Sequence, residues 1–214
     1  TQDNRMKLFS AGPSPFGRKV KVALHVLSLM SNVEVVATDT SQPDTENRKQ
    51  NPLGKIPTLL ADGKAIYDSR VILEYLDSKA GGGKLFPSHG PERIDLLVQA
   101  ALADGIMDAG ILIIYENRMR PEGMQVASIM DYQRGKIERS LQALEAQSLV
   151  YENGPMPNAA EIGLACAIDY LDLRAIVDWR AHSPSMQGFM TAFAASVPGY
   201  HDTLPEGIPD APWR

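Results

Sequence analysis

Residues 51–77 read NPLGKIPTLLADGKAIYDSRVILEYLD, and this stretch predicts a loop, a β-hairpin and a helix in succession. Proline and glycine interrupt the loop, and the apolar run over residues 58–60 has the length of a short strand. The Asp62-Gly63 pair is a strong hairpin signal, so residues 65–67 form the returning strand. The stretch therefore predicts one edge of a small antiparallel sheet, followed directly by a helix.

The helix after this hairpin begins with polar residues. Asp68 and Ser69 occupy the place of an N-cap, and apolar side chains recur behind them at helical spacing. These apolar residues are Val71, Ile72, Tyr75 and Leu76. Backbone amides and a hydroxyl at a helix N-terminus favour a carboxylate. We therefore expect a polar pocket for an anionic group at this end of the sheet.

Pro57 stands between Ile56 and the first strand of the hairpin, where a tight turn can hold a cis proline. A cis peptide bond there turns the backbone groups of Ile56 outward. These groups are then free to pair with an extended peptide as an added strand. The sequence thus predicts a peptide-binding edge beside the anion pocket.

The whole pattern, Asn-Pro-x-Gly-Lys-Ile-Pro, a hairpin and then Tyr-Asp-Ser-Arg-x-Ile-x-Glu-Tyr-Leu, resembles the glutathione-binding half of the cytosolic glutathione S-transferases. The resemblance implies that Ile56 pairs with the cysteinyl backbone of glutathione, the co-substrate. It also implies that Asp68 and Ser69 hold the γ-glutamyl end and that Lys55 holds the glycyl end. The family usually shows Glu-Ser or Gln-Ser, so Asp-Ser is a shorter variant. The alternative interpretation is a capped helix after a hairpin, with no ligand.

Composition restricts the class of protein. The chain has 214 residues, of which 44% are hydrophobic and 22% charged, with a net charge of −5, as in an ordinary globular protein. The negative charge argues against a nucleic-acid binder. We expect no membrane segment, because no apolar run approaches about 18–20 residues, and no signal peptide.

The cysteine and histidine content argues against disulfides and metals. The single Cys166 cannot form an intramolecular disulfide, which fits a reducing cytoplasm. It lies in an apolar run and reads as a small buried hydrophobe. The four histidines are scattered without metal-ligand spacing, so we predict no metal site.

The first half of the chain alternates strands and helices. Residues 6–10 read as the first strand, and a helix begins after Ser14, with Pro15 in its first turn. Residues 33–36 read as the second strand. With the hairpin and helix that follow, this order is thioredoxin-like over residues 6–83.

A segment rich in glycine and proline over residues 81–91 reads as a linker, and the pattern beyond it is helical. The predicted helices span residues 93–117, 126–147, 158–179 and 186–196. Residues 92–214 therefore form an all-helical domain, and the fold class is α/β plus all-α. This arrangement is similar to the second domain of the same transferases. The resemblance implies that this domain contributes a hydrophobic substrate pocket and that the protein is a homodimer.

The transferases of this family deliver a thiolate to an electrophile. A free thiol has a pKa of about 8.5 and is little ionised at pH 7. A protein donor must therefore stabilise the sulfur anion. The known donors are Tyr or Ser, and a third subgroup uses Cys for thiol exchange. Residues 1–16 contain no Tyr, and Ser14 in Ser14-Pro15-Phe16 matches the Ser or Cys position. We therefore assign catalysis to Ser14. Ser10 is the second candidate donor, and a purely structural N-cap at Ser14 is the alternative.

Two carboxylates, Asp104 and Asp108, lie four residues apart on an otherwise apolar helix, and they repel each other unless they are solvated or paired. The resemblance implies that an acidic residue of this helix reaches the γ-glutamyl amine across the dimer interface. Asp104 is the candidate for that role. A solvated face, or pairing with Arg18 or Arg70, is the alternative.

The electrophile pocket has four candidate lining residues. Met107, Ile111 and Tyr115 follow on neighbouring faces of the helix, and Gly12 lies in the first loop. The alternative for such a stripe is ordinary core packing.

Residues 101–110 further resemble a bacterial subgroup of the family. The chain is identified as a member of the Ser-type, cytosolic, homodimeric glutathione S-transferases. The implied activity ionises the glutathione thiol and adds it to a hydrophobic electrophile. The alternative is a non-catalytic protein of the same fold that binds glutathione, another ligand or a protein partner. A glutathione-dependent isomerase, dehalogenase or peroxidase shares the same motifs.

Overall fold

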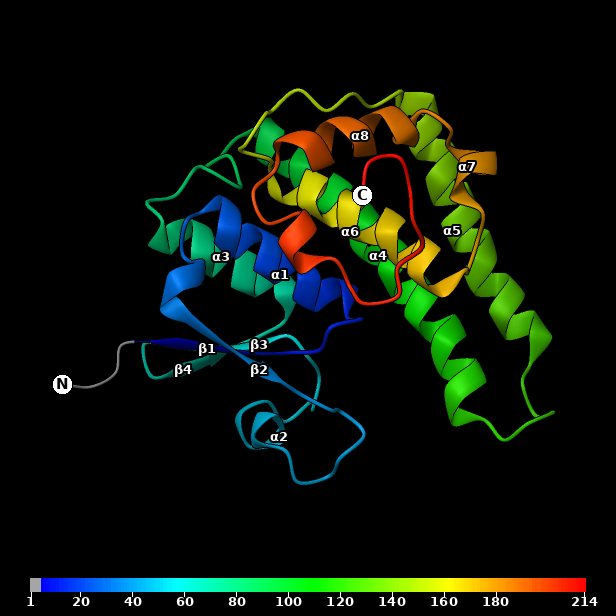
Figure 1. The fold of residues 1–214 in the computed structure, drawn as a ribbon, viewed down its shortest axis with the longest axis horizontal. Helices are drawn as coiled ribbons and strands as arrows, with labels where there is room; N and C mark the ends of the chain where they lie inside the picture. Colours follow the sequence, from blue (N-terminus) through cyan, green and yellow to red (C-terminus); the bar gives the residue numbers. More distant parts are fainter. Residues whose placement is uncertain (1–4) are drawn as a thin grey trace.

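The computed structural model describes residues 5–214, and its first half is built around a four-stranded sheet (Figure 1). The strands are β1 (Met6–Ser10), β2 (Val33–Ala37), β3 (Thr58–Ala61) and β4 (Lys64–Ile66). Their order is β2-β1-β3-β4; β1 is parallel to β2 and antiparallel to β3, and β4 returns antiparallel to β3. The predicted strands and hairpin are thus confirmed.

Three helices belong to this half, namely α1 (Pro15–Val26), α2 (Glu46–Gln50) and α3 (Ser69–Lys79). In Figure 1, α1 and α3 cover the face of the sheet that meets the helical half, and α2 lies on the opposite side. The covered face is a core in which Leu8, Val20 and Leu24 are fully buried. Burial of each such side chain contributes about 1.5–3 kcal/mol, so this packing fixes α1 over the sheet.

The rest of the chain is helical. Its helices are α4 (Pro91–Met119), α5 (Ala127–Gln147), α6 (Ala159–Arg174), α7 (Trp179–His182) and α8 (Met186–Ser196). Two 3-10 turns are η1 (Met30–Asn32) and η2 (His201–Thr203). The α6 helix is buried along most of its length because it packs against both α1 and α4. The fold is therefore the predicted α/β half followed by an all-helical half.

The third predicted helix is too long. The sequence predicts one helix over residues 158–179, whereas α6 ends at Arg174 and α7 begins at Trp179. The chain turns at Ala175, which has a left-handed φ of 48°, and the Ile176 N–H donates to the Leu171 carbonyl at 3.2 Å. This geometry closes a helix C-terminus. Because alanine takes the position that glycine usually holds, the sequence carries no conventional stop signal here.

The α4 helix corrects the expectation that no apolar run is long enough to span a membrane. By length and composition alone α4 passes that test, even though Asp104 and Asp108 interrupt it. In the fold, α4 packs against α5 and α6, and its Asp104 is buried in an ion pair. Packing against these helices accounts for part of this hydropathy, since 39% of the apolar window is buried.

A buried ion-pair cluster, the Asp169 cluster, joins α1 to the helical half. Asp169 on α6 accepts from Arg18 at 2.6 Å, from the Tyr200 hydroxyl at 2.9 Å and from Arg214 at 2.6 Å. Arg214 also reaches Asp172 at 2.7 Å. The cluster therefore holds α1, α6 and the C-terminal segment together.

The loop between α3 and α4 is anchored by one carboxylate. Asp77, 4% exposed, accepts from the backbone N–H groups of Gly83, Lys84 and Leu85 at 3.1, 2.9 and 2.9 Å. Three hydrogen bonds to a buried carboxylate are a strong constraint. The glycine-rich segment is thus held against the end of α3.

Candidate functional site

A cavity of about 550 Å³ opens between the sheet half and the helical half. One wall comes from the loops after β1 and before β3, and the other comes from α4 and α6. Five of the residues predicted from the sequence line it, namely Ser14, Lys55, Ile56, Ile111 and Tyr115. The fold thus brings together side chains that are far apart in the sequence.

Ser14 lies at the start of α1, as predicted. Its Oγ accepts from the Gly17 N–H at 3.1 Å, and its own N–H donates to the Ala11 carbonyl at 3.1 Å. The hydroxyl proton remains free to donate to a group in the cavity. Because the helix N-terminus also favours negative charge, the position suits stabilisation of a sulfur anion.

Ser10, the second candidate donor, is placed differently. It ends β1, is 1% exposed and is not among the residues that line the cavity. Within residues 5–214 its Oγ has no hydrogen-bond partner. A Cβ on Gly17 would lie only 2.1 Å from that Oγ, so α1 passes directly over it. The geometry therefore favours Ser14 over Ser10 as a donor to a cavity ligand.

The loop before β3 presents backbone groups to the cavity. The Ile56–Pro57 peptide bond is cis, as predicted. Within residues 5–214 the backbone N–H and C=O of Ile56 have no hydrogen-bond partner. They are therefore available to an extended ligand that lies along this edge.

Two buried asparagines shape the same loop, and the sequence analysis did not assign them this role. Asn47 and Asn51, each 1% exposed, donate to the Lys55 carbonyl at 3.1 and 3.2 Å. The Thr58 hydroxyl donates to the same oxygen at 3.0 Å. Asn51 belongs to the Asn-Pro motif, whereas Asn47 lies in a polar helix without a distinctive signal. Together they fix the backbone beside Ile56.

The N-terminus of α3 carries Asp68 and Ser69. The Asp68 carboxylate accepts from the Arg70 N–H at 3.0 Å, so it is the N-cap, and Ser69 is 2% exposed. Neither residue lines the 550 Å³ cavity. The Arg70 guanidinium lies 3.9 Å from both Asp68 and Asp108, and it connects this helix end to the cavity wall on α4.

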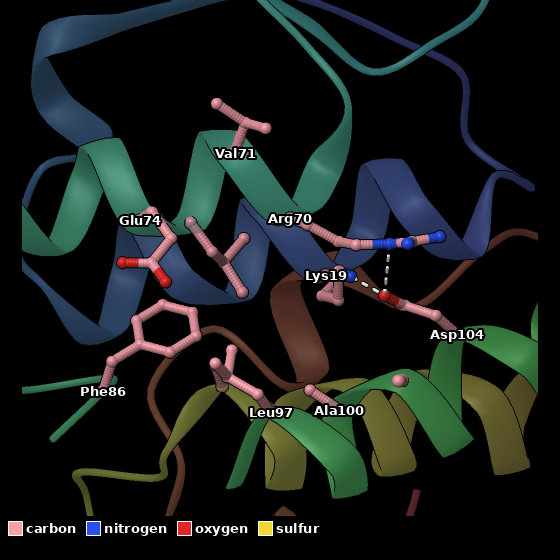
Figure 2. Close-up of a pocket in the computed structure, with 11 residues that line it drawn as sticks. Lys19, Arg70, Val71, Glu74, Phe86, Leu97, Ala100 and Asp104 are labelled. Carbon is pink, nitrogen blue, oxygen red and sulfur yellow. Dashed lines mark hydrogen bonds and ion pairs between the residues drawn. The ribbon is translucent and has the colours of Figure 1, made fainter. Parts of the chain in front are cut away.

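Asp104 is held inside its own chain. Figure 2 shows Lys19 of α1 and Arg70 of α3 converging on it. Lys19 Nζ donates to Oδ1 at 2.6 Å, and Arg70 Nε lies 3.1 Å from Oδ2 without hydrogen-bond alignment. The predicted partner Arg70 is thus present, whereas Arg18 pairs with Asp169 instead. The buried Oδ2 has no hydrogen bond within residues 5–214, so it can accept one from a ligand.

Lys19 is a site residue that the sequence analysis missed. Its side chain is 4% exposed, which requires a buried counter-charge. The signal was available, because Lys19 lies four residues before Ala23 and shares the buried face of α1. A lysine on that face predicts a buried acid opposite it.

Asp108 is the acidic residue of the described cavity lining. Burial raises the pKa of its carboxyl, and the negative charges of Asp104 and Asp68 add to the rise. The positive charges of Arg70 and Lys55 act against it. Five ionisable groups thus gather where α3, α4 and the Lys55 loop meet.

The candidate electrophile-pocket residues divide into two groups. Ile111 and Tyr115 line the cavity, whereas Met107 is fully buried and belongs to the core. Gly12 borders a smaller hollow that shares Ser14 with the main cavity. The structure therefore brings Ile111 and Tyr115, and not Met107, beside the Ser14 loop.

Several further cavity residues escaped the sequence analysis, and four of them are aromatic or basic, namely Phe16, Arg118, Tyr170 and Arg174. Phe16 was within reach because it follows Ser14 directly. The other three lie on α4 and α6, and their convergence depends on how the two helices cross. Periodicity within one helix carries no signal for that geometry.

Cys166 does not line the 550 Å³ cavity. Cys166 is 2% exposed, and burial raises the pKa of its thiol to about 11, so it is not an activated nucleophile. In the described part of the chain, no group of three or more His, Cys, Asp or Glu side chains is placed to hold a metal ion.

Comparison with known proteins identifies the family. A family model described as the N-terminal domain of glutathione S-transferase matches residues 8–84. The Escherichia coli (strain K12) protein named "Uncharacterized GST-like protein YibF" is 33% identical over 187 residues, which cover 85% of this chain and 90% of that protein. The chain belongs to the glutathione S-transferase family. The bacterial character of this relative agrees with the subgroup that residues 101–110 resemble.

Solved structures of glutathione transferases share the fold. A family member from Pseudomonas fluorescens Pf-5, determined with bound glutathione, is 36% identical with a TM-score of 0.81, and the match covers 96% of this chain and all of that one. A glutathione S-transferase from Methylobacillus flagellatus KT, also with glutathione bound, is 35% identical with a TM-score of 0.83. That match covers 94% of this chain and 99% of that one. The likeness extends over both halves of the molecule.

Proposed function

We propose that this glutathione S-transferase family member is an active transferase. It ionises the glutathione thiol beside Ser14 and adds the thiolate to an electrophile held between α4 and α6. One observation carries the proposal: a serine hydroxyl at a helix N-terminus faces the same cavity as the unpartnered backbone of Ile56. The glutathione bound in the Pseudomonas and Methylobacillus proteins supports glutathione as the co-substrate.

Each part of glutathione has a proposed partner. The cysteinyl backbone pairs with Ile56, and the glycyl carboxylate lies near Lys55. The γ-glutamyl carboxylate binds at the α3 N-terminus with Asp68 and Ser69, where amides and the helix dipole favour an anion. The γ-glutamyl ammonium donates to the unsatisfied Oδ2 of Asp104. These assignments place the sulfur beside Ser14.

The proposed reaction combines proton loss with bond exchange at carbon. The thiol proton passes to water, and the Ser14 hydroxyl donates a hydrogen bond to the resulting thiolate. The sulfur electron pair then forms a bond to the electrophilic carbon, and the electron pair of the bond that breaks there passes to the leaving group or, in an addition, to the adjacent electron-withdrawing group. The helix N-terminus contributes further to the stability of the anion.

Ser14→Ala tests the proposed function. The thiolate absorbance of bound glutathione, titrated across pH, should give a thiol pKa below about 8.5 in the wild type and a higher value in the variant. Turnover should fall by about 10²–10³-fold, the scale of one lost donor to a developing anion. Ser10→Ala is the matched control, because Ser10 lies outside the cavity, and it should change neither quantity.

Other outcomes separate the alternatives. An unshifted thiol pKa in the wild type, with glutathione bound, indicates a binding protein. No glutathione binding at all means that only the fold is shared. The cytoplasmic location expected from the single cysteine stays a prediction.

We also propose a homodimer through the face of α3 and α4. A groove of about 230 Å³ lies between these helices, and Val71, Leu97 and Ala100 line it (Figure 2). Val71 in this groove is 51% exposed, and Ile94, which precedes Leu97 by one turn of α4, is 59% exposed. A second copy of the chain would cover this apolar surface, which a monomer rarely exposes in one patch. The same contact would bring the partner subunit close to Asp104.

The dimer proposal is tested by the mass in solution. Sedimentation of the wild type should give about twice the 23.4 kDa of one chain, and Val71→Asp should shift the mass towards one chain, because an unpaired charge in an apolar interface is costly. Val150→Asp, at an exposed position outside the groove, is the control. A monomeric wild type contradicts the proposal. An Asp104→Ala effect that is identical in the Val71→Asp monomer would contradict a cross-subunit role for Asp104.

A further inference from the structure

Two arginines line the cavity on the helical side. Arg118 lies in the last turn of α4 and Arg174 in the last turn of α6. Arg70, Arg120 and Arg180 each pair with an acidic side chain. Among residues 5–214, in contrast, no carboxylate lies within 4.0 Å of Arg118 or Arg174. The cavity therefore holds two positive charges that the protein does not neutralise.

Arg174 is also short of hydrogen-bond partners. Its Nε is buried and has no partner within the described residues. Leaving a buried donor unpaired is costly, and more so for a charged group. Its guanidinium carbon lies 6.0 Å from the centre of the Tyr170 ring, and the group is close enough to act on the Tyr170 hydroxyl as a hydrogen-bond donor, so Nε is the donor that stays unpaired. The arrangement calls for an acceptor that this chain does not supply.

The guanidiniums of Arg118 and Arg174 both influence the Tyr170 hydroxyl. Burial raises the pKa of this hydroxyl, while the positive charges of Arg174 and then Arg118 act against the rise. Tyr170 also borders the small hollow beside Ser14. The arginine pair thus lies across Tyr170 from the loop that carries the proposed thiolate donor.

The charges in the cavity are separated along α4. Asp108, with Lys55 and Arg70 nearby, marks the side that we assign to glutathione. Arg118 lies about 15 Å farther along the helix, at about 1.5 Å per residue. The apolar residues Ile111 and Tyr115 lie between them on the cavity wall. A matching electrophile has a reactive carbon near Ser14, an apolar body and an anion at its far end.

We propose that the electrophile carries a carboxylate or a similar anion, which Arg118 and Arg174 bind together. The inference rests on the proposed transferase function and specifies its substrate class. A carboxylate accepts charge-assisted hydrogen bonds from guanidinium groups and relieves the repulsion between the two cations. A neutral ester keeps a carbonyl acceptor but carries no charge to offset the two guanidiniums, so the site discriminates by charge as well as by size. The glutathione carboxylates do not compete, because they bind at Lys55 and at the α3 N-terminus.

A matched pair of substrates tests this inference, namely 4-chloro-3,5-dinitrobenzoate and its methyl ester. In both, the glutathione sulfur bonds to the ring carbon that bears chlorine, and negative charge moves into the ring and nitro groups. Chloride then leaves with the electron pair of the C–Cl bond, and the thiol proton has passed to water. Dividing each kcat/KM by the uncatalysed rate removes the difference in intrinsic reactivity.

The wild type should favour the carboxylate over the ester by about tenfold to a hundredfold, the scale of a charged hydrogen-bond partner. Arg118→Gln and Arg174→Gln should each remove most of this preference, because turnover of the acid should fall far more than turnover of the ester, and glutathione affinity should stay nearly unchanged. Arg174→Lys should restore part of it. Arg139→Gln, at an exposed arginine outside the cavity, is the control and should keep the full preference. Equal turnover of acid and ester, or equal loss of both in the variants, overturns the inference and leaves the transferase function standing.

Binding of the two conjugates separates this inference from the proposed function. The glutathione conjugates of the acid and of the ester are titrated into the protein by calorimetry. Tighter binding of the acid conjugate, lost in Arg174→Gln, supports the anion site even if turnover is absent and the transferase proposal fails. Equal affinities overturn the anion site. A fall in the affinity of glutathione itself in both arginine variants also overturns it, because the arginines would then hold a glutathione carboxylate.

Discussion

Arg18 and Lys19 are neighbours in α1, and each pairs with a buried aspartate, yet the two aspartates are satisfied to different degrees. Asp169 receives two donors on each oxygen, from Arg18 and the Tyr200 hydroxyl on Oδ2 and from two nitrogens of Arg214 on Oδ1. Asp104 receives Lys19 on Oδ1, and its Oδ2 has no hydrogen bond in the described structure. The first carboxylate is hydrogen-bonded at both oxygens, whereas the second has one oxygen that lies 3.1 Å from Arg70 Nε without a hydrogen bond.

The difference follows from where the two sides of α1 point. Arg18 faces α6 and the C-terminal segment, where its guanidinium donates to Thr203, to the Tyr200 carbonyl and to Asp169, so the buried polar atoms are matched within the chain. Lys19 faces α3 and α4, beside the groove of Figure 2 and the helix end that we assign to the γ-glutamyl group. We therefore propose a structural role for Asp169 and a binding role for Asp104. The following variants test this distinction.

The largest expected effect belongs to Asp169→Asn. Removing this charge leaves Arg18 and Arg214 buried without their main counter-charge, so the free energy of unfolding should fall by about 3–5 kcal/mol. Urea denaturation measures the loss, and added glutathione should not change its size. Asp178→Asn, at an exposed helix cap, is the control and should cost far less. A loss below about 1 kcal/mol would show that the cluster is not needed for stability.

Asp104→Asn should also lower stability, because it leaves the buried Lys19 without its counter-charge, and unlike Asp169→Asn it should have an effect that depends on the ligand. The amide cannot accept an ammonium as a carboxylate does, so glutathione affinity should fall by about 1–3 kcal/mol. Calorimetric titration measures the affinity, and denaturation with and without glutathione should show a smaller stabilisation by the ligand than in the wild type. Asp95→Asn, at an exposed position of the same helix outside the cavity, is the control. An Asp104→Asn variant that loses stability and keeps its glutathione affinity would move Asp104 into the structural class with Asp169.

The residues that sequence alone could predict are those whose roles are set locally. The segment 51–77 contains its own turn, hairpin and cap, so the cis Pro57, the Asp62-Gly63 hairpin and the Asp68 cap are present as expected. Ser14 likewise caps the helix that follows it. The stop at Ala175 was missed because alanine rarely takes a left-handed conformation.

The rest of the site depends on contacts between elements. Asp104 was recognised as a site candidate, but its partner Lys19 comes from α1, and only packing of α1 against α4 brings them together. Arg118 and Arg174 look like ordinary basic residues in the last turns of their helices, where they also suit the helix dipole. Their shared cavity is set by the crossing of α4 and α6, which amphipathic spacing does not specify.

The smallest expected effect is on the pH dependence of stability, and its sign differs between Asp108 and Asp172. The raised pKa of Asp108 means that the folded protein binds its proton more readily than the unfolded chain. Ionised Asp108 therefore lowers stability as pH rises from about 3.9, the ordinary value, through the folded pKa. Asp172, in the Asp169 cluster, behaves in the opposite way. Burial alone raises its pKa, but hydrogen bonds from Arg180 and Arg214 bring it below the ordinary value.

Ionised Asp172 stabilises the fold fully at pH values above the ordinary pKa of the unfolded chain. This contribution is lost as pH falls through the lowered pKa of the folded protein. Urea midpoints should therefore be measured from pH 3 to pH 7 for two variants. The Asp108→Asn variant should have a slightly higher urea midpoint than the wild type at pH 7 and the same midpoint in acid. The difference should be small because the Asp108 side chain is 57% exposed. The Asp172→Asn variant should have a lower urea midpoint than the wild type at pH 7 and should approach the wild-type midpoint in acid. Curves of the same sign would show that the environments of the two carboxylates do not differ as the structure indicates.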